Sequence, residues 1–246
     1  MRYFLELAYF GKAYHGWQRQ PTAITVQEVV EKAISTLLQQ KIALTGAGRT
    51  DAGVHASQLY AHFDTSEELA KDLIYRLNSF LPKDIVIRDL FKVGAEAHAR
   101  FDALSRSYEY HLVCSKDVFK TGTAYYVHKE LDLEKMNEAA AILLDYSDFK
   151  CFSRSRTDVK TYKCDISHAY WEKTGHELVF YIKADRFLRN MVRAIVGTLL
   201  QIGLGKMEVQ AMHEIIKSGD RSEAGASVPA HGLFLTRIEY PKSIFS

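Results

Sequence analysis

Apolar residues alternate with polar ones at the start of the chain and then change period. Every second position from Tyr3 to Tyr9 is apolar, which is typical of a strand. From Val26 to about Gln40 the apolar positions recur at helical spacing, and Thr25 with Glu28 has the spacing of a capping box. Similar patterns predict strands near 42–45 and 58–63, a helix over 67–80 and a strand over 84–93.

The second part of the chain shows a comparable order of elements. The patterns predict strands at 105–114, 164–173, 177–185 and 233–240, with a hairpin turn around Gly175. They predict helices at 131–145, 187–203 and 208–217, and a long loop at 218–232. Helices that alternate with largely antiparallel strands indicate the α+β class. We divide the chain into an N-terminal half, 1–100, and a C-terminal half, 101–246.

Composition narrows the possible environment and chemistry. The 246 residues contain no apolar window long enough to span a membrane, and the first segment lacks the pattern of a signal peptide. Three separated cysteines argue against a disulfide framework or a zinc site. The ten histidines show no metal-ligand spacing. We therefore expect a cytoplasmic protein, and these residues indicate no metal site.

Positive charge is concentrated in two segments, although the net charge is only +2. Such runs are usually solvated surface, but they are also where a nucleic acid would bind. Part of the second segment must face inward, because apolar residues interleave it. The two groups are Lys150, Arg154, Arg156, Lys160 and Lys163, and then Lys183, Arg186, Arg189 and Arg193.

The segment GAGRTDAGVHA, residues 46–56, is the most unusual stretch of the chain. It is not a Walker-A loop, because Val54 and His55 stand where a lysine and a serine or threonine would be required. It is not a dinucleotide fingerprint, because Asp51 occupies the position of the third glycine and would repel a pyrophosphate.

Small residues around Asp51 let a ligand or another backbone segment approach closely. In extended backbone Arg49 and Asp51 project to the same side, and a nearby arginine keeps a carboxylate ionised at neutral pH. An ionised carboxylate suits a nucleophile or an electrostatic stabiliser. On the residues alone, a tight turn in which Asp51 is only structural explains the segment equally well.

Five segments together resemble the tRNA pseudouridine synthase A family. GAGRTDAGVHA resembles the segment that carries the family's catalytic aspartate. The others, in chain order, are YFGKAYHGWQRQ, HARFDALSRSYEY, FLRNMVRAIVGTLLQIG and AHGLFL. The resemblance as a whole runs from residue 3 to about 240. The resemblance implies two α+β halves with antiparallel sheets side by side, helices packed on them and an active-site cleft between the halves.

The resemblance also implies roles for individual residues. Asp51 would be the nucleophile, attacking C1′ of the ribose or C6 of the uracil. Tyr108 would stack on the flipped base, and Arg193 would pair with Asp51. Arg49 would hold the phosphate of the flipped nucleotide or the space that its base vacates. The remaining candidates would contact RNA: Gln18, Arg19, His55, Arg186 and Arg189. Trp17 and Tyr110 are expected to be core residues.

The implied substrate is tRNA, with the modified uridines at positions 38 to 40 of the anticodon stem-loop, and the implied assembly is a homodimer without cofactors. A related synthase for another RNA site, a noncatalytic RNA-binding protein and a nucleotide-hydrolysing enzyme are the alternatives. The segment CFSRSRTDVKTYKC, residues 151–164, departs from the proteobacterial version of the family, so its RNA role stays open.

Overall fold

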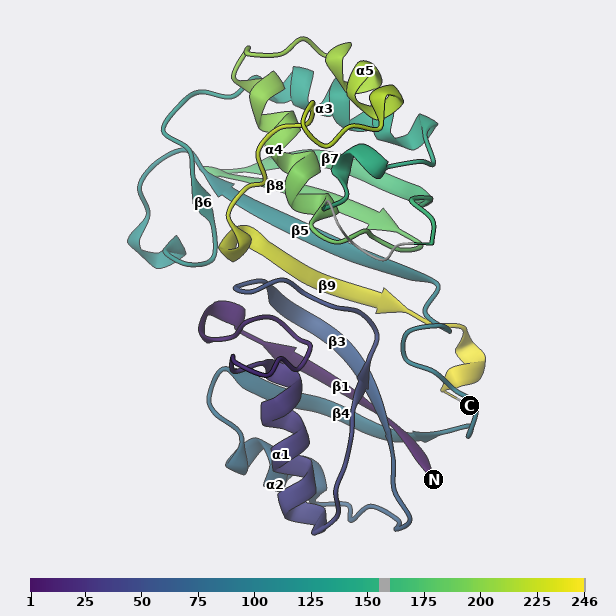
Figure 1. Ribbon diagram of the computed structural model, residues 1–246. Helices are drawn as coiled ribbons and strands as arrows, with labels where there is room; N and C mark the ends of the chain where they lie inside the picture. Colours follow the sequence, from purple (N-terminus) through teal and green to yellow (C-terminus); the bar gives the residue numbers. More distant parts are fainter. Residues whose placement is uncertain (155–159, 246) are drawn as a thin grey trace. The chain divides into compact units, whose positions relative to one another are not determined.

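The chain forms two compact units in a computed structural model that describes residues 1–154 and 160–245 (Figure 1). The first unit is Met1–Ser105 with Phe234–Ser246, and the second is Arg106–Leu233. The expected C-terminal half, 101–246, is therefore corrected at both ends, because the last strand of the chain belongs to the first unit.

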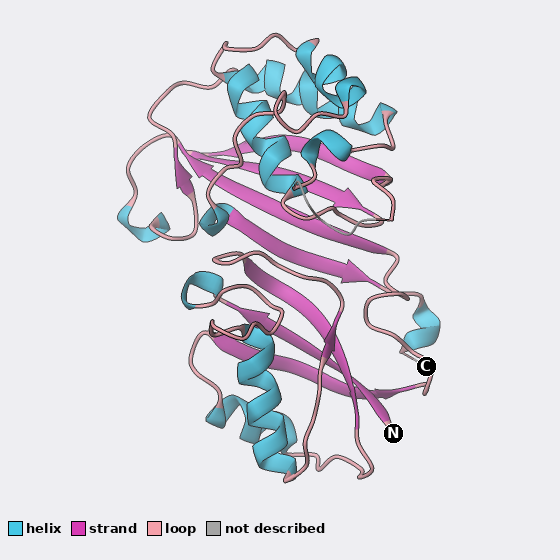
Figure 2. Cartoon of the chain, in the orientation of Figure 1, coloured by secondary structure: helices cyan, strands magenta, loops and turns pink. Residues whose placement is uncertain are grey.

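The first unit is a twisted sheet with two helices on one face (Figures 1 and 2). Its strands lie in the order β4-β1-β3-β9, and the short β2 also pairs with β3. All these pairings are antiparallel except that of β3 with β9. The elements are β1 (Arg2–Tyr9), α1 (Val26–Leu38), β2 (Thr45–Gly46), β3 (His55–Asp64), α2 (Leu73–Phe80), β4 (Ile85–Val93) and β9 (Leu233–Glu239).

The core of this unit follows from the alternation in β1 and the helical period of α1. Leu5 and Leu7 of β1, Val30 and Ile34 of α1 and Leu77 of α2 are all fully buried. Burying such side chains contributes about 1.5–3 kcal/mol each relative to leaving them in water. The predicted strand at 42–45 shrinks to the two residues of β2, while β3 begins at His55 rather than at residue 58.

Helix α1 begins where the sequence predicts, but the predicted capping box does not form. Thr25 is the N-cap residue, yet its side chain forms no capping hydrogen bond and its buried Oγ1 lacks a partner among the described residues. The Glu28 carboxylate lies 3.9 Å from the Arg19 guanidinium instead. Burial of Thr25, which is 0% exposed, therefore outweighs the local capping preference.

The C-terminal strand is anchored to the first unit by backbone pairing and by hydrogen bonds. Phe234 and Leu235 lie opposite His55 and Ala56 in the parallel ladder. The backbone N–H of Ile238 donates to Oε1 of Gln58 over 2.9 Å. These contacts join residues about 180 positions apart, which explains why sequence periodicity alone assigned the strand to the wrong half.

The second unit is a sheet in the order β5-β8-β7, with the short β6 paired to β5 (Figure 2). The β7–β8 hairpin is confirmed, and Gly175 in its turn has a φ of +62°. Helix α3 packs on both β7 and α4. The elements are β5 (Ser105–Val113), β6 (Tyr125–Tyr126), α3 (Leu133–Ile142), β7 (Ile166–Thr174), β8 (Glu177–Ala184), α4 (Met191–Gly203) and α5 (Ala211–Ser218).

The described residues also contain six single-turn 3-10 helices. They are η1 (Gly11–Ala13), η2 (Val118–Lys120), η3 (Leu143–Asp145), η4 (Lys150–Phe152), η5 (Ala230–Gly232) and η6 (Lys242–Ile244).

Helix α4 begins four residues later than the apolar pattern predicts. Asn190 has a left-handed φ of +66°, and the N–H of Met191 donates to the carbonyl of Leu188 in a turn. A non-glycine residue in this conformation interrupts a right-handed helix. Arg186 and Arg189 therefore do not share a helical stripe with Arg193, which is the third residue of α4.

His111 links β5 to β8 and to the loop that follows β5. Its Nδ1 lies 2.7 Å from Oε1 of Glu177 and its Nε2 lies 3.2 Å from Oε2 of Glu109. Lys120 of η2 binds the other Glu177 oxygen over 2.7 Å. Burial disfavours the charged ring, but the two carboxylates outweigh it and raise the pKa of His111.

This network makes part of the stability depend on pH. A folded-state pKa above the unfolded value stabilises the protein below the unfolded pKa, and the gain is lost as pH rises through the folded pKa. We expect His111→Gln to lower the free energy of unfolding more at pH 6 than at pH 9, as measured by urea titration at both pH values. His176→Gln, exposed in the adjacent turn, is the control. An equal loss at both pH values would contradict a charged His111.

Candidate active site

The Asp51 loop rests on the backbone of residues 11–17. A Cβ at Gly11 would overlap the carbonyl of Val54, and a Cβ at Gly16 would overlap the carbonyl of Thr50. Gly16 also has a φ of +84°, a conformation that residues with a side chain rarely adopt. The segment after β1 therefore lies directly against the loop because these two residues have no side chain.

Thr50 joins this segment to the loop. Its Oγ1 accepts the backbone N–H of Trp17 over 3.1 Å and shares a 2.8 Å hydrogen bond with the hydroxyl of Tyr9. Trp17 is 2% exposed, so the prediction that it is a core residue is confirmed. Its indole packs on Gly46, where any Cβ would overlap the ring. Thr50, which directly precedes Asp51, is thus held by Tyr9 and by the backbone of Trp17.

Asp51 is half-buried and begins a tight turn. The N–H of Val54 donates to the Asp51 carbonyl over 3.2 Å, and Gly53 has a φ of +79°. The Gly53 N–H in turn donates to the carbonyl of Tyr14. Within the described residues, a Cβ at Gly48 would meet no heavy atom within 4 Å. The loop is therefore held from one side and is sterically open at Gly48.

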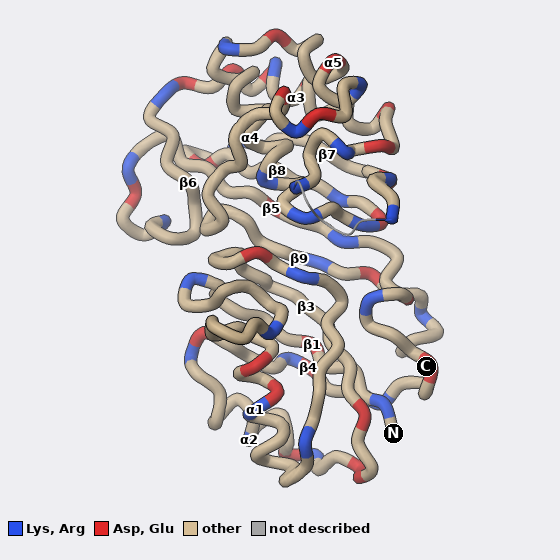
Figure 3. Tube along the Cα trace, in the orientation of Figure 1, with Lys and Arg blue, Asp and Glu red and all other residues tan. Residues whose placement is uncertain are grey.

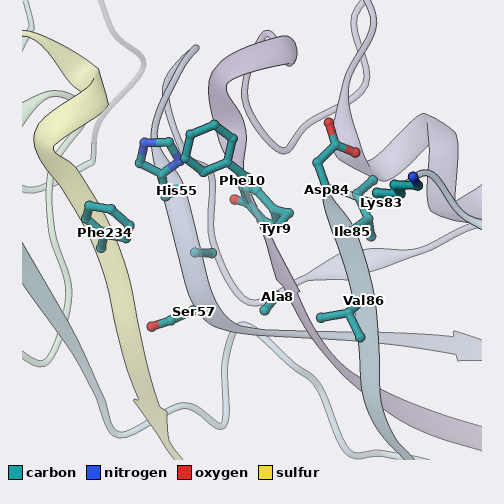
Figure 4. Close-up of a pocket in the computed structure, with 11 residues that line it drawn as sticks. Ala8, Tyr9, Phe10, His55, Ser57, Lys83, Asp84, Ile85, Val86 and Phe234 are labelled. Carbon is teal, nitrogen blue, oxygen red and sulfur yellow. The ribbon is translucent and has the colours of Figure 1, made fainter. Parts of the chain in front are cut away.

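His55 positions the end of this loop. Its ring is 1% exposed and lies between Phe10 and Phe234, with centroid distances of 4.4 and 4.5 Å (Figure 4). Its Nδ1 accepts the N–H of Gly11 over 2.9 Å. The expected RNA contact of His55 is corrected to a structural role, because its ring is enclosed by its neighbours. An adjoining open hollow of about 290 Å³ is lined by Ala8 and by other residues of this unit.

The other candidates of the first unit lie at the surface. Arg49 and Gln18 are exposed. Arg19 is also exposed and lies 3.6 Å from the Glu31 carboxylate, next to the N-terminal part of α1. All three are accessible to a macromolecule.

Tyr108 and Tyr110 of β5 have different environments. Tyr108 is half-buried, with its ring edge-on to Phe187 at a centroid distance of 5.1 Å. Tyr110 is 0% exposed, and its hydroxyl donates to the carbonyl of Pro229 over 2.8 Å. Burial raises the pKa of Tyr110 far above its usual range. The prediction that Tyr110 is a packing residue is confirmed.

Arg193 is oriented by a segment that packs on α4. Its Nε donates to the carbonyl of Val228 over 2.8 Å, and the N–H of Val228 donates to the carbonyl of Arg193. A Cβ at Gly197 would overlap the carbonyl of Ala226, and Gly225 donates its N–H to Oγ1 of Thr198. The half-buried guanidinium is thus fixed through backbone groups of residues 224–229.

The described basic residues of the two groups lie mainly in the segment before β7 and in the loop between β8 and α4, where Figure 3 marks Lys and Arg in blue. Arg189 is exposed, and its carbonyl accepts the N–H of Arg154 over 3.1 Å. Arg186 is half-buried and donates to the carbonyl of Thr161 over 3.4 Å. Arg156 lies outside the described residues.

No cluster of three or more metal-ligating side chains is arranged around a common point in residues 1–154 and 160–245. Burial raises the pKa of the Cys151 and Cys164 thiols to about 12, so neither is a thiolate at neutral pH. Within the same residues, no helix combines the length and apolar character required to cross a membrane.

Sequence reasoning missed Thr50 and the carbonyl of Val228 as positioning groups. For Thr50 the available signal was its place between Arg49 and Asp51, two candidate site residues. For Val228 no sequence signal exists, because every residue provides the same backbone carbonyl.

Comparison with known proteins identifies relatives over almost the whole chain. The profile of a family described as tRNA pseudouridine synthase matches residues 7–102 and 139–241. A Porphyromonas gingivalis protein named tRNA pseudouridine synthase A is 53% identical over 251 residues, covering 99% of each chain. A Parabacteroides distasonis protein of the same name is 49% identical, covering 99% of this chain and 98% of its own. A Clostridium perfringens protein named tRNA pseudouridine synthase A 2 is 40% identical, covering 96% and 98%.

The glycine contacts of the loop predict unequal effects of two similar substitutions. We expect Gly16→Ala to lower the free energy of unfolding by at least ~2 kcal/mol, because it adds backbone strain and an overlap with the Thr50 carbonyl. Gly48→Ala should change it by less than about 0.5 kcal/mol, because its Cβ has room. Urea unfolding of both variants measures the difference, and equal effects would refute the close contact at Gly16.

Proposed function

The chain belongs to the tRNA pseudouridine synthase family, and is an isomerase of that family; we propose that it converts uridine to pseudouridine at positions 38 to 40 of the tRNA anticodon stem-loop. The proposal of Asp51 as the nucleophile is supported by one observation above all. The carboxylate is half-buried on a turn whose backbone is held by Gly11, Gly16 and Thr50. Such preorganisation keeps a nucleophile in a reactive position without reorganisation.

The reaction rearranges bonds without a net change in atoms. Asp51 attacks the nucleotide at C1′ of the ribose or at C6 of the uracil, and the N1–C1′ bond breaks. The base rotates, C5 bonds to C1′, the bond to Asp51 breaks, the proton on C5 leaves and N1 gains a proton. Neither carbon is accessible in a stacked stem, so the nucleotide must first leave the stack. The open space at Gly48 is compatible with the approach of a flipped nucleotide.

Tyr108 and Arg193 supply the second set of proposed roles. The half-buried ring of Tyr108, braced by Phe187, stacks on the flipped uracil and takes part in removing the C5 proton. Arg193 is the proposed ion-pair partner of the Asp51 carboxylate, as the family resemblance implies. Its Nε is committed to the Val228 carbonyl, which sets the orientation of the remaining donors.

The exposed polar residues fit contacts to the RNA backbone. We assign Arg49 to the phosphate of the flipped nucleotide or to the space that its base vacates. Gln18, Arg19, Arg186 and Arg189 would position the rest of the RNA through phosphate and sugar contacts, which carry little sequence information. A cytoplasmic homodimer, with one tRNA crossing both subunits, would gather basic groups from two chains of modest net charge.

Tritium release from C5-labelled uridine tests the reaction and its position together. The substrates are tRNAs with a single labelled uridine at position 38, 39 or 40, or at a site outside the anticodon arm. We expect release by the wild type from the first three only, and a loss of at least about 1000-fold in Asp51→Asn, which is nearly isosteric but not a nucleophile.

Asp72→Asn is the matched control, because Asp72 is exposed before α2 and forms no capping hydrogen bond. It should react like the wild type. Wild-type release only from the site outside the anticodon arm would favour a related synthase for a different RNA position. Equal release by the wild type and Asp51→Asn would remove Asp51 from the mechanism.

Arg193→Gln tests the electrostatic role of the guanidinium. We expect kcat/KM to fall on the order of 100-fold, because the Asp51 carboxylate loses the cation proposed to pair with it. The measurement is the rate of tritium release from the labelled tRNA.

Arg221→Gln is the control, since Arg221 binds Ala224 and Ser227 in the same loop but has no proposed chemistry. It should keep the kcat/KM of the wild type. An unchanged kcat/KM in Arg193→Gln would remove Arg193 from the proposed site.

A further inference from the structure

The HARF segment, residues 98–101, has no role in the proposed chemistry but has an unusual surface. It lies between β4 and β5 in the first unit. Phe101 is 74% exposed and the nearby Leu104 is 59% exposed. Single exposed apolar residues are common and need no explanation by themselves. Phe101 differs from such residues because its neighbours hold the segment in one conformation.

The backbone of this segment is fixed by its own side chains. Nδ1 of His98 accepts the N–H of Arg100 over 3.1 Å and that of Phe101 over 3.3 Å. The His98 N–H donates to the Asp102 carboxylate over 2.7 Å, and the Asp102 N–H donates to the carbonyl of His98. Four hydrogen bonds therefore define the conformation of five residues.

Contacts to the sheet fix the same segment in space. The Ala99 N–H donates to Nδ1 of His62 on β3 over 3.1 Å, and its carbonyl accepts the hydroxyl of Tyr240. Burial, together with the charges of Arg2 and His98, lowers the pKa of His62 to about 4, so this ring is a neutral acceptor at physiological pH. The segment is thus attached rigidly to the core of the first unit.

The two side chains that this framework presents are an arginine and an aromatic ring. The Phe101 ring packs on His98 at a centroid distance of 4.3 Å, and Cζ of Arg100 lies 5.7 Å from the Phe101 centroid. Arg100 is itself exposed. With three quarters of Phe101 accessible, most of the ring remains available to a flat ligand.

We propose that Arg100 and Phe101 form a platform on which an unpaired nucleobase of the RNA substrate stacks. Proteins recognise unstacked RNA bases by packing them on aromatic rings and guanidinium planes. A positive charge beside the ring suits the phosphate that accompanies such a base, and a rigid ring loses little conformational entropy on binding. The identity of the RNA as tRNA rests on the proposed function.

The strand register separates the platform from the Asp51 loop. The platform is attached at His62, which lies opposite Phe4 of β1, whereas the loop enters β3 at the level of Tyr9. Five residues of a strand span about 16 Å. The platform therefore contacts a nucleotide other than the reacting one, so it contributes to binding and not to the chemical step.

Phe101→Ala tests the platform against Tyr75→Ala, a change at an equally exposed aromatic residue, 76% accessible, on α2. We expect Phe101→Ala to raise KM for tRNA about tenfold with kcat within about twofold of the wild type, and Phe101→Trp to restore KM. Tyr75→Ala should match the wild type. In an Asp51→Asn background, Phe101→Ala should weaken equilibrium binding of tRNA by the same factor.

The other possible results of this experiment distinguish a failure of the platform from a failure of the proposed function. Weaker tRNA binding by Phe101→Ala, in a protein that modifies no uridine, would leave the platform standing while the proposed function fails. Unchanged KM and tRNA affinity in Phe101→Ala would overturn the platform. A changed oligomeric state in Phe101→Ala with unchanged tRNA affinity would also overturn it and would point to a second copy of the chain as the occupant.

Discussion

The contact between the backbone of residues 11–17 and the Asp51 loop is the constraint on which the candidate site depends. Gly11 and Gly16 admit the carbonyls of Val54 and Thr50, and a side chain at either position would push the loop away. Thr50 then connects the two segments through its hydroxyl. The small residues around Asp51 are thus explained in part by packing, as at Gly46, whereas a Cβ at Gly48 would have open space.

The second unit fixes its proposed site residue in the same physical way. Arg193 is held by the Val228 carbonyl, and residues 224–229 reach α4 closely because Gly197 and Gly225 lack side chains. In both units, backbone carbonyls and glycine contacts determine where the functional side chain lies. Such groups are numerous and rigid, and they do not change their charge with pH, so they provide stable reference points for a carboxylate or a guanidinium.

The extent to which sequence could predict this structure varies with the range of the interactions involved. Periodicity located β1, α1, α3 and the β7–β8 hairpin, because local burial determines them. It missed the left-handed Asn190, whose conformation is set by the turn before α4, and the pairing of β9 with β3, which joins distant residues. The HARF segment was recognised as a motif, but the exposure of Phe101 follows only from the hydrogen bonds of His98.

The path of the chain between the two units has a consequence for biosynthesis. Residues 106–233 are contiguous and can begin to fold as they leave the ribosome, since domains generally fold as units during synthesis. The first unit must wait for residues 234–246, and the His55 ring lacks its partner Phe234 until then. A nascent or truncated chain that lacks Phe234 thus leaves the end of the Asp51 loop unfinished, because the His55 ring then packs on Phe10 alone.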